Sequence, residues 1–175
     1  MLSVGKRDFR HYIWLKRASQ ERKYRNQPKN WFRIGCYIVS SVGKVLIKGR
    51  EELKTLGKYY IVDLGIRNYL LGYRDVDTGH MIENLVYFEL LRRGYDVAVG
   101  KIGNKEIDFI ARKDNEKIYY QVTEDMISES TRESELAPLT MVRDNYRKVV
   151  LTLSTNSTAS VNGIEIIRLV DFLLE

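Results

Sequence analysis

The chain has 175 residues, 44% of them hydrophobic and 30% charged, with a formal net charge of +6 at pH 7. This length and composition predict a soluble globular protein with one well-packed domain and room for a small additional segment. No stretch approaches the roughly 18 consecutive apolar residues that a membrane span requires, and the N-terminus lacks the apolar region of a secretory signal. One cysteine and two histidines argue against a disulfide framework and a cysteine- or histidine-based metal cluster. We therefore expect a cytoplasmic protein that does not enter a membrane.

The positive charge lies at the N-terminus. Residues 1–35 contain ten lysines and arginines against two acidic residues, a balance of +8, whereas residues 36–175 contain nineteen against twenty-one, a balance of −2. Basic side chains interleaved with aromatic ones can contact phosphates and stack on bases, so this arm is a candidate nucleic-acid contact. It could equally be a solvated arm whose aromatic residues dock on the rest of the protein or on a partner. The candidate phosphate contacts are Arg7, Arg10, Lys16, Arg17, Arg22, Lys23 and Arg25.

Hydrophobic spacing and turn residues predict weak elements before residue 63 and more regular ones after it. Asp63 and Thr78 are good N-cap residues for two helices, and the second helix has the clearest helical spacing in the chain. The first half is predicted to contain a helix at 11–19, strands at 31–39 and 42–47 with a turn around 40–43, one helical turn at 51–56 ended by Gly57, an extended run at 59–62, and helices at 63–71 and 78–93. The second half is predicted to contain a strand at 95–102, a hairpin at 105–123, a helix at 128–143, a strand at 148–153, a loop at 154–162, a strand at 164–169 and a helix at 170–174. Antiparallel strands followed by a crossover to further strands predict an α/β domain with a mixed sheet and helices on both faces.

The hairpin from residue 106 to residue 123 is the centre of the functional interpretation. Apolar residues at 107, 109 and 111 alternate with polar ones, and the same alternation recurs from 117 to 123, which is typical of half-buried strands. A turn at Asp114-Asn115 sets Asp108 opposite Gln121 and Glu106 opposite Thr123, all on one face. Two carboxylates and an amide oxygen on one face form a candidate metal site, and they are equally consistent with a solvated face.

Three stretches of the chain resemble one known family. They are KYYIVDLGIRN at 58–68, GHMIENLVY at 79–87 and EIDF at 106–109. On these stretches, residues 36–175 are similar to the C-terminal domain of unknown function of prokaryotic AAA-type ATPases. Glu83, Asp108 and the Gln121-x-Thr123 pair also follow the layout of the PD-(D/E)xK nuclease superfamily.

The resemblance implies a mixed-sheet, restriction-endonuclease-like core flanked by helices. It divides the chain into a basic arm at 1–35, a remnant of a winged-helix-like joining segment at 36–77, and a nuclease-like domain at 78–175. In the family an ATPase precedes this module, but the sequence contains no G-x-x-x-x-G-K-[ST] loop to cradle nucleotide phosphates. The ATPase is therefore expected as a separate domain or subunit.

The resemblance also implies a metal site formed by Glu83, Asp108 and Gln121, with Mg²⁺ as the cofactor if the site is active, because Mg²⁺ prefers hard oxygen ligands. The superfamily has Glu/Gln-x-Lys where this chain has Gln121-Val122-Thr123. The lysine that positions the attacking water and offsets negative charge is thus missing. Lys101 or Lys105, on the preceding strand and turn, could substitute for it.

Each candidate residue also has a purely structural interpretation. Glu83 near a helix N-terminus interacts favourably with the helix dipole, Asp108 could pair across strands with Lys101 or Lys117, and Gln121 could lie on a solvated surface. Weighing both, we expect a nuclease-fold module of an AAA-type ATPase that is catalytically impaired and binds nucleic acid or a partner. The alternatives are a Mg²⁺-dependent DNA endonuclease with a relocated lysine, and a remnant of a larger ATPase.

Overall fold

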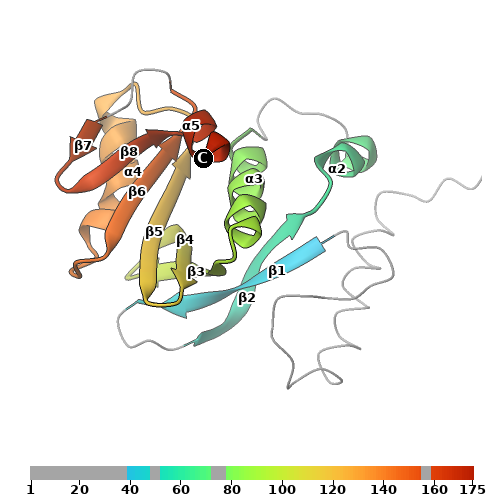
Figure 1. The fold of residues 1–175 in the computed structure, drawn as a ribbon, viewed down its shortest axis with the longest axis horizontal. Helices are drawn as coiled ribbons and strands as arrows, with labels where there is room; N and C mark the ends of the chain where they lie inside the picture. The colour runs from blue at the N-terminus through green and yellow to red at the C-terminus, as the bar shows by residue number, and fades with distance from the viewer. Residues whose placement is uncertain (1–38, 48–51, 72–77, 155–158) are drawn as a thin grey trace, which may run out of the picture.

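The computed structural model describes residues 39–47, 52–71, 78–154 and 159–175. The basic arm, the helix predicted at 11–19 and nearly all of the strand predicted at 31–39 lie outside these residues. The described chain forms one mixed sheet flanked by helices (Figure 1). Its elements are β1 (Val39–Leu46), β2 (Glu52–Ile61), α2 (Leu64–Leu71), α3 (Thr78–Arg92), β3 (Asp96–Ile102), β4 (Lys105–Lys113), β5 (Glu116–Thr123), α4 (Glu129–Thr140), β6 (Arg147–Thr152), β7 (Ala159–Val161), β8 (Ile164–Arg168) and α5 (Leu169–Leu174).

The strands follow the order β2-β1-β3-β4-β5-β6-β8-β7 across an eight-stranded sheet of the described residues. The central β3, β4 and β5 form an antiparallel meander. On one side β1 joins β3 in parallel and pairs with β2 in antiparallel fashion. On the other side β6 and β8 extend the sheet in parallel. The predicted mixed α/β architecture is therefore confirmed.

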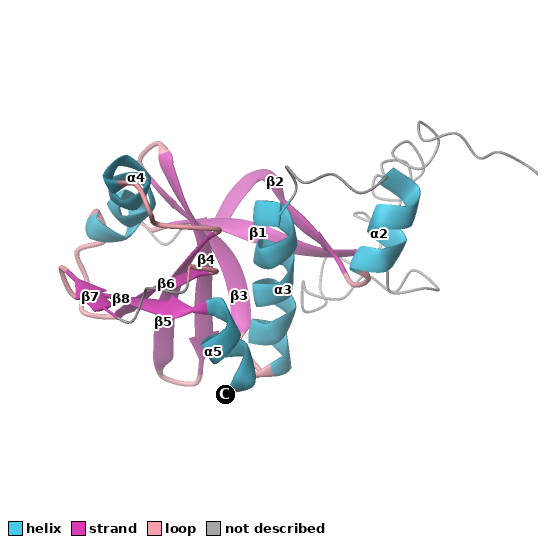
Figure 2. Cartoon of the chain, turned by 90° about the horizontal axis from the view of Figure 1, so that it is seen from above, coloured by secondary structure: helices cyan, strands magenta, loops and turns pink. Residues whose placement is uncertain are grey.

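Helices cover both faces of the sheet, as the view in Figure 2 makes clear. On one face α3 and α5 bury a core cluster that includes Val86, Leu90 and Phe172 against strand residues such as Phe109. On the other face α4 packs Leu136 and Leu139 into a second cluster with strand residues from β3 to β8. The two faces are filled by alternate residues of the same strands, because successive side chains of a strand point to opposite sides.

The region before α2 differs from the sequence prediction. Residues 39–46 form one strand with no turn at Ser40-Ser41, and β2 includes residues 52–56, where the sequence predicts a helical turn. Pairing with β1 overrides the weak local helical preference of this stretch. Both strands also belong to the same sheet as β3, so the segment that the sequence assigns to a joining region is continuous with the rest of the fold.

Three further predictions can be compared directly with the structure. The helix capped by Asp63 is confirmed, because the Ile66 N–H donates to Asp63 Oδ1 at 3.0 Å. The hairpin register is confirmed from Lys113 opposite Glu116 to Phe109 opposite Tyr120, whereas the predicted pairs Asp108–Gln121 and Glu106–Thr123 lie beyond this regular pairing. The loop predicted at 154–162 is wrong at its end, where β7 pairs with β8. The Asn162-Gly163 pair between them has positive φ values of 53° and 76°, which suits the tight hairpin turns that favour these residues.

Within the described ranges, no helix is long and apolar enough to cross a membrane.

Candidate functional site

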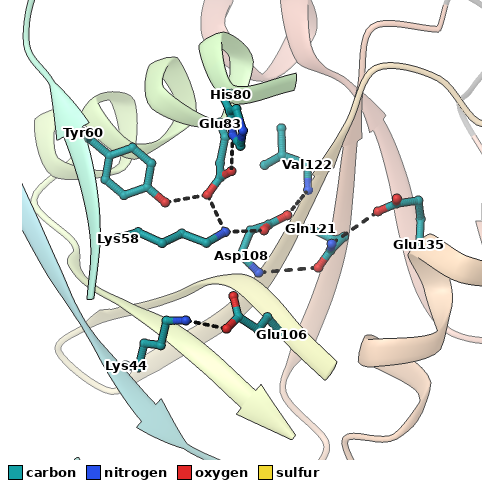
Figure 3. A network of polar contacts seen from close by, with 10 residues as sticks. All are labelled: Lys44, Lys58, Tyr60, His80, Glu83, Glu106, Asp108, Gln121, Val122 and Glu135. Atoms are coloured by element: carbon teal, nitrogen blue, oxygen red, sulfur yellow. Dashed lines mark hydrogen bonds and ion pairs between the residues drawn. The ribbon is translucent and has the colours of Figure 1, made fainter. Parts of the chain in front are cut away.

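Three charged side chains from three different elements meet beside the N-terminal half of α3. The Lys58 Nζ of β2 donates to Glu83 Oε1 of α3 at 2.7 Å and to Asp108 Oδ1 of β4 at 3.0 Å (Figure 3). The Tyr60 hydroxyl donates to the same Glu83 oxygen at 2.5 Å. We call Lys58, Tyr60, Glu83 and Asp108 the Lys58 cluster. It joins the two acidic residues that the sequence singled out with a lysine that it did not.

An irregularity in β2 brings Lys58 to the carboxylates. Val42 of β1 pairs with Lys58, but Lys44 pairs with Leu53, so one β1 residue faces four residues of β2. Bulges of this kind bend a strand and redirect its side chains, and they are frequent next to active sites. Gly57 lies in the bulge, where a Cβ atom would be only 1.9 Å from the Val42 carbonyl oxygen. The two strands can approach this closely only because residue 57 has no side chain.

A second bulge, in β4, redirects Asp108. Ala98 of β3 pairs with Ile110 and Gly100 pairs with Ile107, so the single residue between them on β3 faces both Asp108 and Phe109. The simple alternation predicted for this strand is therefore broken. Ile107 packs in the cluster under α4, whereas Phe109 packs in the cluster under α3, although the sequence pattern placed both on one face.

Two polar contacts hold α3 so that Glu83 faces β2. The Asn84 side-chain amide accepts from the Ile61 N–H and donates to the Ile61 carbonyl, both at 2.8 Å. One turn further along, the Tyr87 hydroxyl is hydrogen-bonded to Ser40 Oγ of β1 at 2.7 Å, and its ring stacks on Tyr60 with centroids 4.4 Å apart. The helix is thus anchored to both β1 and β2, and the orientation of Glu83 follows from that anchoring.

The electrostatics of the cluster reflect burial opposed by ion pairing. Burial raises the pKa of Asp108 to about 6, although the Lys58 charge opposes this rise. Burial alone would lower the pKa of Lys58, but the charges of Asp108 and Glu83 outweigh it, so the pKa is raised. The pKa of Tyr60 is also raised, by burial and by Glu83. At neutral pH Lys58 is therefore a cation and Tyr60 a neutral hydrogen-bond donor.

Asp108 and Gln121 lie just beyond the last paired residues of β4 and β5, Phe109 and Tyr120, and the Gln121 oxygen is not directed at the carboxylates. Gln121 Oε1 accepts from the Asp108 backbone N–H at 3.4 Å, and Gln121 Nε2 donates to Glu135 Oε2 of α4 at 3.2 Å. The second Asp108 oxygen accepts from the Val122 N–H at 3.0 Å. The structure therefore brings Glu83 and Asp108 together on Lys58 and gives the side chain of Gln121 backbone and helix contacts instead.

The other candidate residues lie around this centre. Thr123 is buried and donates from its hydroxyl to the Asp125 carbonyl at 3.0 Å, which stabilises the turn after β5. The cation paired with Asp108 is Lys58, and neither Lys101 nor Lys105 has a hydrogen bond or ion pair to Glu83 or Asp108. Lys117, the other cross-strand partner considered, is paired with Asp144 instead.

Two more polar side chains border the cluster. His80 Nδ1 is 4.0 Å from Glu83 Oε2, and the imidazole is 81% exposed. Lys44 of β1 forms an ion pair with Glu106 two residues before Asp108 (Figure 3). Lys58 itself could have been found from the sequence, because it begins the 58–68 stretch that carries the family resemblance.

The carboxylate oxygens of Glu83 and Asp108 suit a hard divalent cation, but they are only two side-chain ligands. Glu83 and Asp108 supply carboxylate oxygens to one point, and Mg²⁺ is commonly held by one or two carboxylates together with water and substrate phosphate. Among the described residues, no three His, Cys, Asp or Glu side chains are grouped so that they could hold a metal ion. Any metal here would therefore rely on the two carboxylates and on oxygens supplied by water and substrate.

The raised pKa of Asp108 predicts a pH dependence of stability. A carboxyl whose pKa rises from 3.8 to about 6 on folding binds its proton more tightly when folded, so its contribution is complete below pH ~4 and is lost as the pH rises through ~6. Two pKa units correspond to about 3 kcal/mol. In urea denaturation, we expect the free energy of unfolding of the unmodified protein to fall by up to ~3 kcal/mol between pH 4 and pH 7 relative to that of Asp108→Asn. The variant has no carboxyl group at this position to lose its proton.

Asp144→Asn is the matched control for that measurement. Burial raises the pKa of Asp144, but the hydrogen bond from Tyr119 and the charge of Lys117 outweigh it, and the net shift is downward from 3.8. The stabilisation that the ionised Asp144 provides is therefore lost only as the pH falls below its ordinary pKa of 3.8. The control should follow the unmodified protein between pH 5 and 8. A parallel pH dependence for Asp108→Asn and the unmodified protein would contradict the prediction.

Comparison with known proteins adds one relative. An "Uncharacterized protein" of Haemophilus influenzae (strain ATCC 51907 / DSM 11121 / KW20 / Rd) is 45% identical over 129 residues, which are 74% of this chain and 32% of the relative. The chain therefore spans about a third of the length of the curated relative it matches. No family model and no solved structure matches the chain. The fold and the site together define a mixed α/β protein in which one lysine forms ion pairs with two carboxylates.

Proposed function

We propose that this chain is a nuclease-fold module that hydrolyses phosphodiester bonds with a bound Mg²⁺ ion, using Glu83, Asp108 and Lys58. The observation that carries the proposal is the position of Lys58, whose ammonium contacts both carboxylates. The sequence favours a catalytically impaired module because Thr123 stands where the superfamily has lysine. Lys58 reaches the same two acids from β2, and this favours the endonuclease with a relocated lysine over the impaired module.

Each residue has a chemical role in this proposal. Glu83 and Asp108 would hold the cation, which when bound supplies electrostatic stabilisation and a water of lowered pKa. The raised pKa of Lys58 keeps its ammonium protonated, so it can orient a water molecule and stabilise negative charge on phosphoryl oxygens but cannot act as a base. Tyr60 donates to Glu83 Oε1 and thereby fixes the orientation of that carboxylate.

The wider features of the fold support the assignment to a PD-(D/E)xK-like core. The acidic residue on α3, the acidic residue on the central β4 and the neighbouring β5 follow the layout that the resemblance implies. As part of the same proposal, the module belongs to a longer protein with an AAA-type ATPase domain. In support, the matched region makes up only 32% of the Haemophilus influenzae relative.

A second candidate is a module that binds nucleic acid or an ATPase partner without turnover. The observation that favours it is that the polar groups of the site already have partners within the protein. Lys58 already forms ion pairs with both carboxylates, and the amide oxygen of Gln121 accepts from the Asp108 N–H. In this alternative, the fold is retained for binding and the ion pairs are structural.

Cleavage of supercoiled plasmid DNA with Mg²⁺ or Mn²⁺ separates the two candidates. We expect metal-dependent nicking by the unmodified chain and a loss of at least about 100-fold in Asp108→Ala and in Glu83→Ala, because each removes a charged ligand from the site. Asp171→Ala, which removes an acid from a surface ion pair with Arg168, serves as the control and should retain full activity. DNA binding without nicking, in a chain that also fails to bind Mn²⁺, would refute the enzymatic proposal and favour the binding module.

A further inference from the structure

Two residues outside the Lys58 cluster, Gln121 and Glu135, are linked to Asp108 by hydrogen bonds. We infer that Gln121 and Glu135 are positioning residues for the site, an inference that rests on the proposed function. The contacts form a continuous relay from the Asp108 N–H to Gln121 Oε1 at 3.4 Å and from Gln121 Nε2 to Glu135 Oε2 at 3.2 Å (Figure 3). The relay connects the catalytic strand β4 with α4 on the opposite face of the sheet.

The relay acts where the regular pairing of β4 with β5 stops. The register between the two strands runs from Lys113 opposite Glu116 to Phe109 opposite Tyr120, and Asp108 lies just beyond it, in the bulge. A bulge leaves its extra residue without regular ladder pairing. Here the Gln121 side chain accepts the Asp108 N–H, and the Val122 N–H donates to Asp108 Oδ2. The backbone and the carboxylate of Asp108 are therefore both held by β5.

Glu135 determines which way the Gln121 amide points. A primary amide has one acceptor end and one donor end, whereas an ionised carboxylate only accepts. Pairing with Glu135 therefore directs Nε2 toward α4 and leaves Oε1 for the Asp108 N–H. The helix backbone at Glu135 is anchored to the sheet, because the next residue of α4, Leu136, is buried in the core cluster on that face.

Exchanging the amide and the carboxylate tests the relay. Gln121→Glu keeps an acceptor for the Asp108 N–H but loses the donor and places a second carboxylate against Glu135. The double variant Gln121→Glu/Glu135→Gln restores one donor and one acceptor between these positions. Glu133→Gln, an exposed position on the same helix, is the control. The measurements are Mn²⁺ affinity by calorimetric titration, the plasmid cleavage rate, thermal unfolding, and hydrogen exchange of the Asp108 amide by NMR.

Gln121→Glu and Glu135→Ala are expected to reduce Mn²⁺ affinity and cleavage by about 10–100-fold, as is usual for groups that orient metal ligands. The Asp108 amide should exchange faster in both variants, while the double variant should recover affinity, cleavage and slow exchange. Glu133→Gln should leave all four measurements unchanged. A folded Gln121→Glu variant that matches the unmodified chain, or a double variant that does not recover, would overturn the inference.

The exchange measurement keeps this test separate from the test of function. If the unmodified chain neither binds Mn²⁺ nor cleaves DNA, the proposed function fails, and the exchange rates alone then decide whether Gln121 and Glu135 hold Asp108. If the unmodified chain is active but the variants lose nothing and show unchanged exchange, the function stands and the positioning role is refuted.

Discussion

Replacing Lys58 with methionine is expected to reduce phosphodiester cleavage by about 10²–10³-fold, as removal of one preorganised electrostatic donor usually does. Metal affinity should not fall with it. The Lys58 ammonium contacts one oxygen of Glu83 and one of Asp108, so it competes with a cation for the same carboxylates, and its removal leaves them free. The expected signature is a large loss of kcat together with equal or tighter Mn²⁺ binding, measured by plasmid nicking and calorimetric titration.

Two other lysines provide controls for this variant. Lys101→Met tests the position that the sequence nominated, and Lys44→Met removes the cation of the neighbouring ion pair with Glu106. Both should retain cleavage within a few-fold of the unmodified chain. If Lys101→Met abolished cleavage and Lys58→Met did not, the relocated lysine would be assigned to β3 and the role given to Lys58 would be wrong.

Substituting Gly57 with alanine should have the largest effect on stability among single-methyl changes near the site. The added Cβ would lie 1.9 Å from the Val42 carbonyl oxygen, and because that atom belongs to the backbone, one strand must move away. Overpacking of this kind typically costs 1–3 kcal/mol, and we expect a loss near the upper end, about 3 kcal/mol, in the free energy of unfolding measured with urea. Cleavage should also fall, because the shift displaces Lys58.

Gly43 offers the matched control, since it lies on β1 directly within the same irregularity. Among the described residues, no atom beyond the chain neighbours of Gly43 lies within 4 Å of a Cβ built there. Gly43→Ala should therefore change the free energy of unfolding by less than ~0.5 kcal/mol, as is usual for surface substitutions. Equal destabilisation by the two alanines would show that the cost comes from the loss of glycine in a strand, and not from the close approach of β1 and β2.

The parts of the fold that could be predicted are those specified by neighbouring residues. Thr78 and Gly94 mark the ends of α3, and Ser128 caps α4 by accepting from the Thr131 N–H. The Asp114-Asn115 turn fixes the register of the central hairpin from Lys113 opposite Glu116 to Phe109 opposite Tyr120. Capping and turn chemistry act within a few residues, so they can be recognised in a single sequence.

The parts that could not be predicted depend on contacts between distant segments. β2 contains a stretch with weak helical preference and becomes a strand only because β1 lies beside it. Both bulges are set by strand pairing, so neither the approach of Lys58 nor the turning of Asp108 follows from periodicity. The Gln121 side chain contacts Glu135 of α4, and no pattern within the hairpin sequence could indicate this partner.

The position of β1 in the sheet also bears on the order in which the parts of the Lys58 cluster assemble during folding. β1 lies between β2 and β3, and its parallel ladder with β3 pairs Lys44 with Val99. Contacts so far apart in the chain carry a large loop-closure entropy and form slowly. Lys58 lies on the far side of β1 and reaches the carboxylates only when this ladder exists. A partly folded chain can therefore hold Asp108 through β5. Both Lys58 and the contacts that orient Glu83 depend on β1 and β2, so we expect the Lys58 cluster to be completed only when the whole sheet has formed.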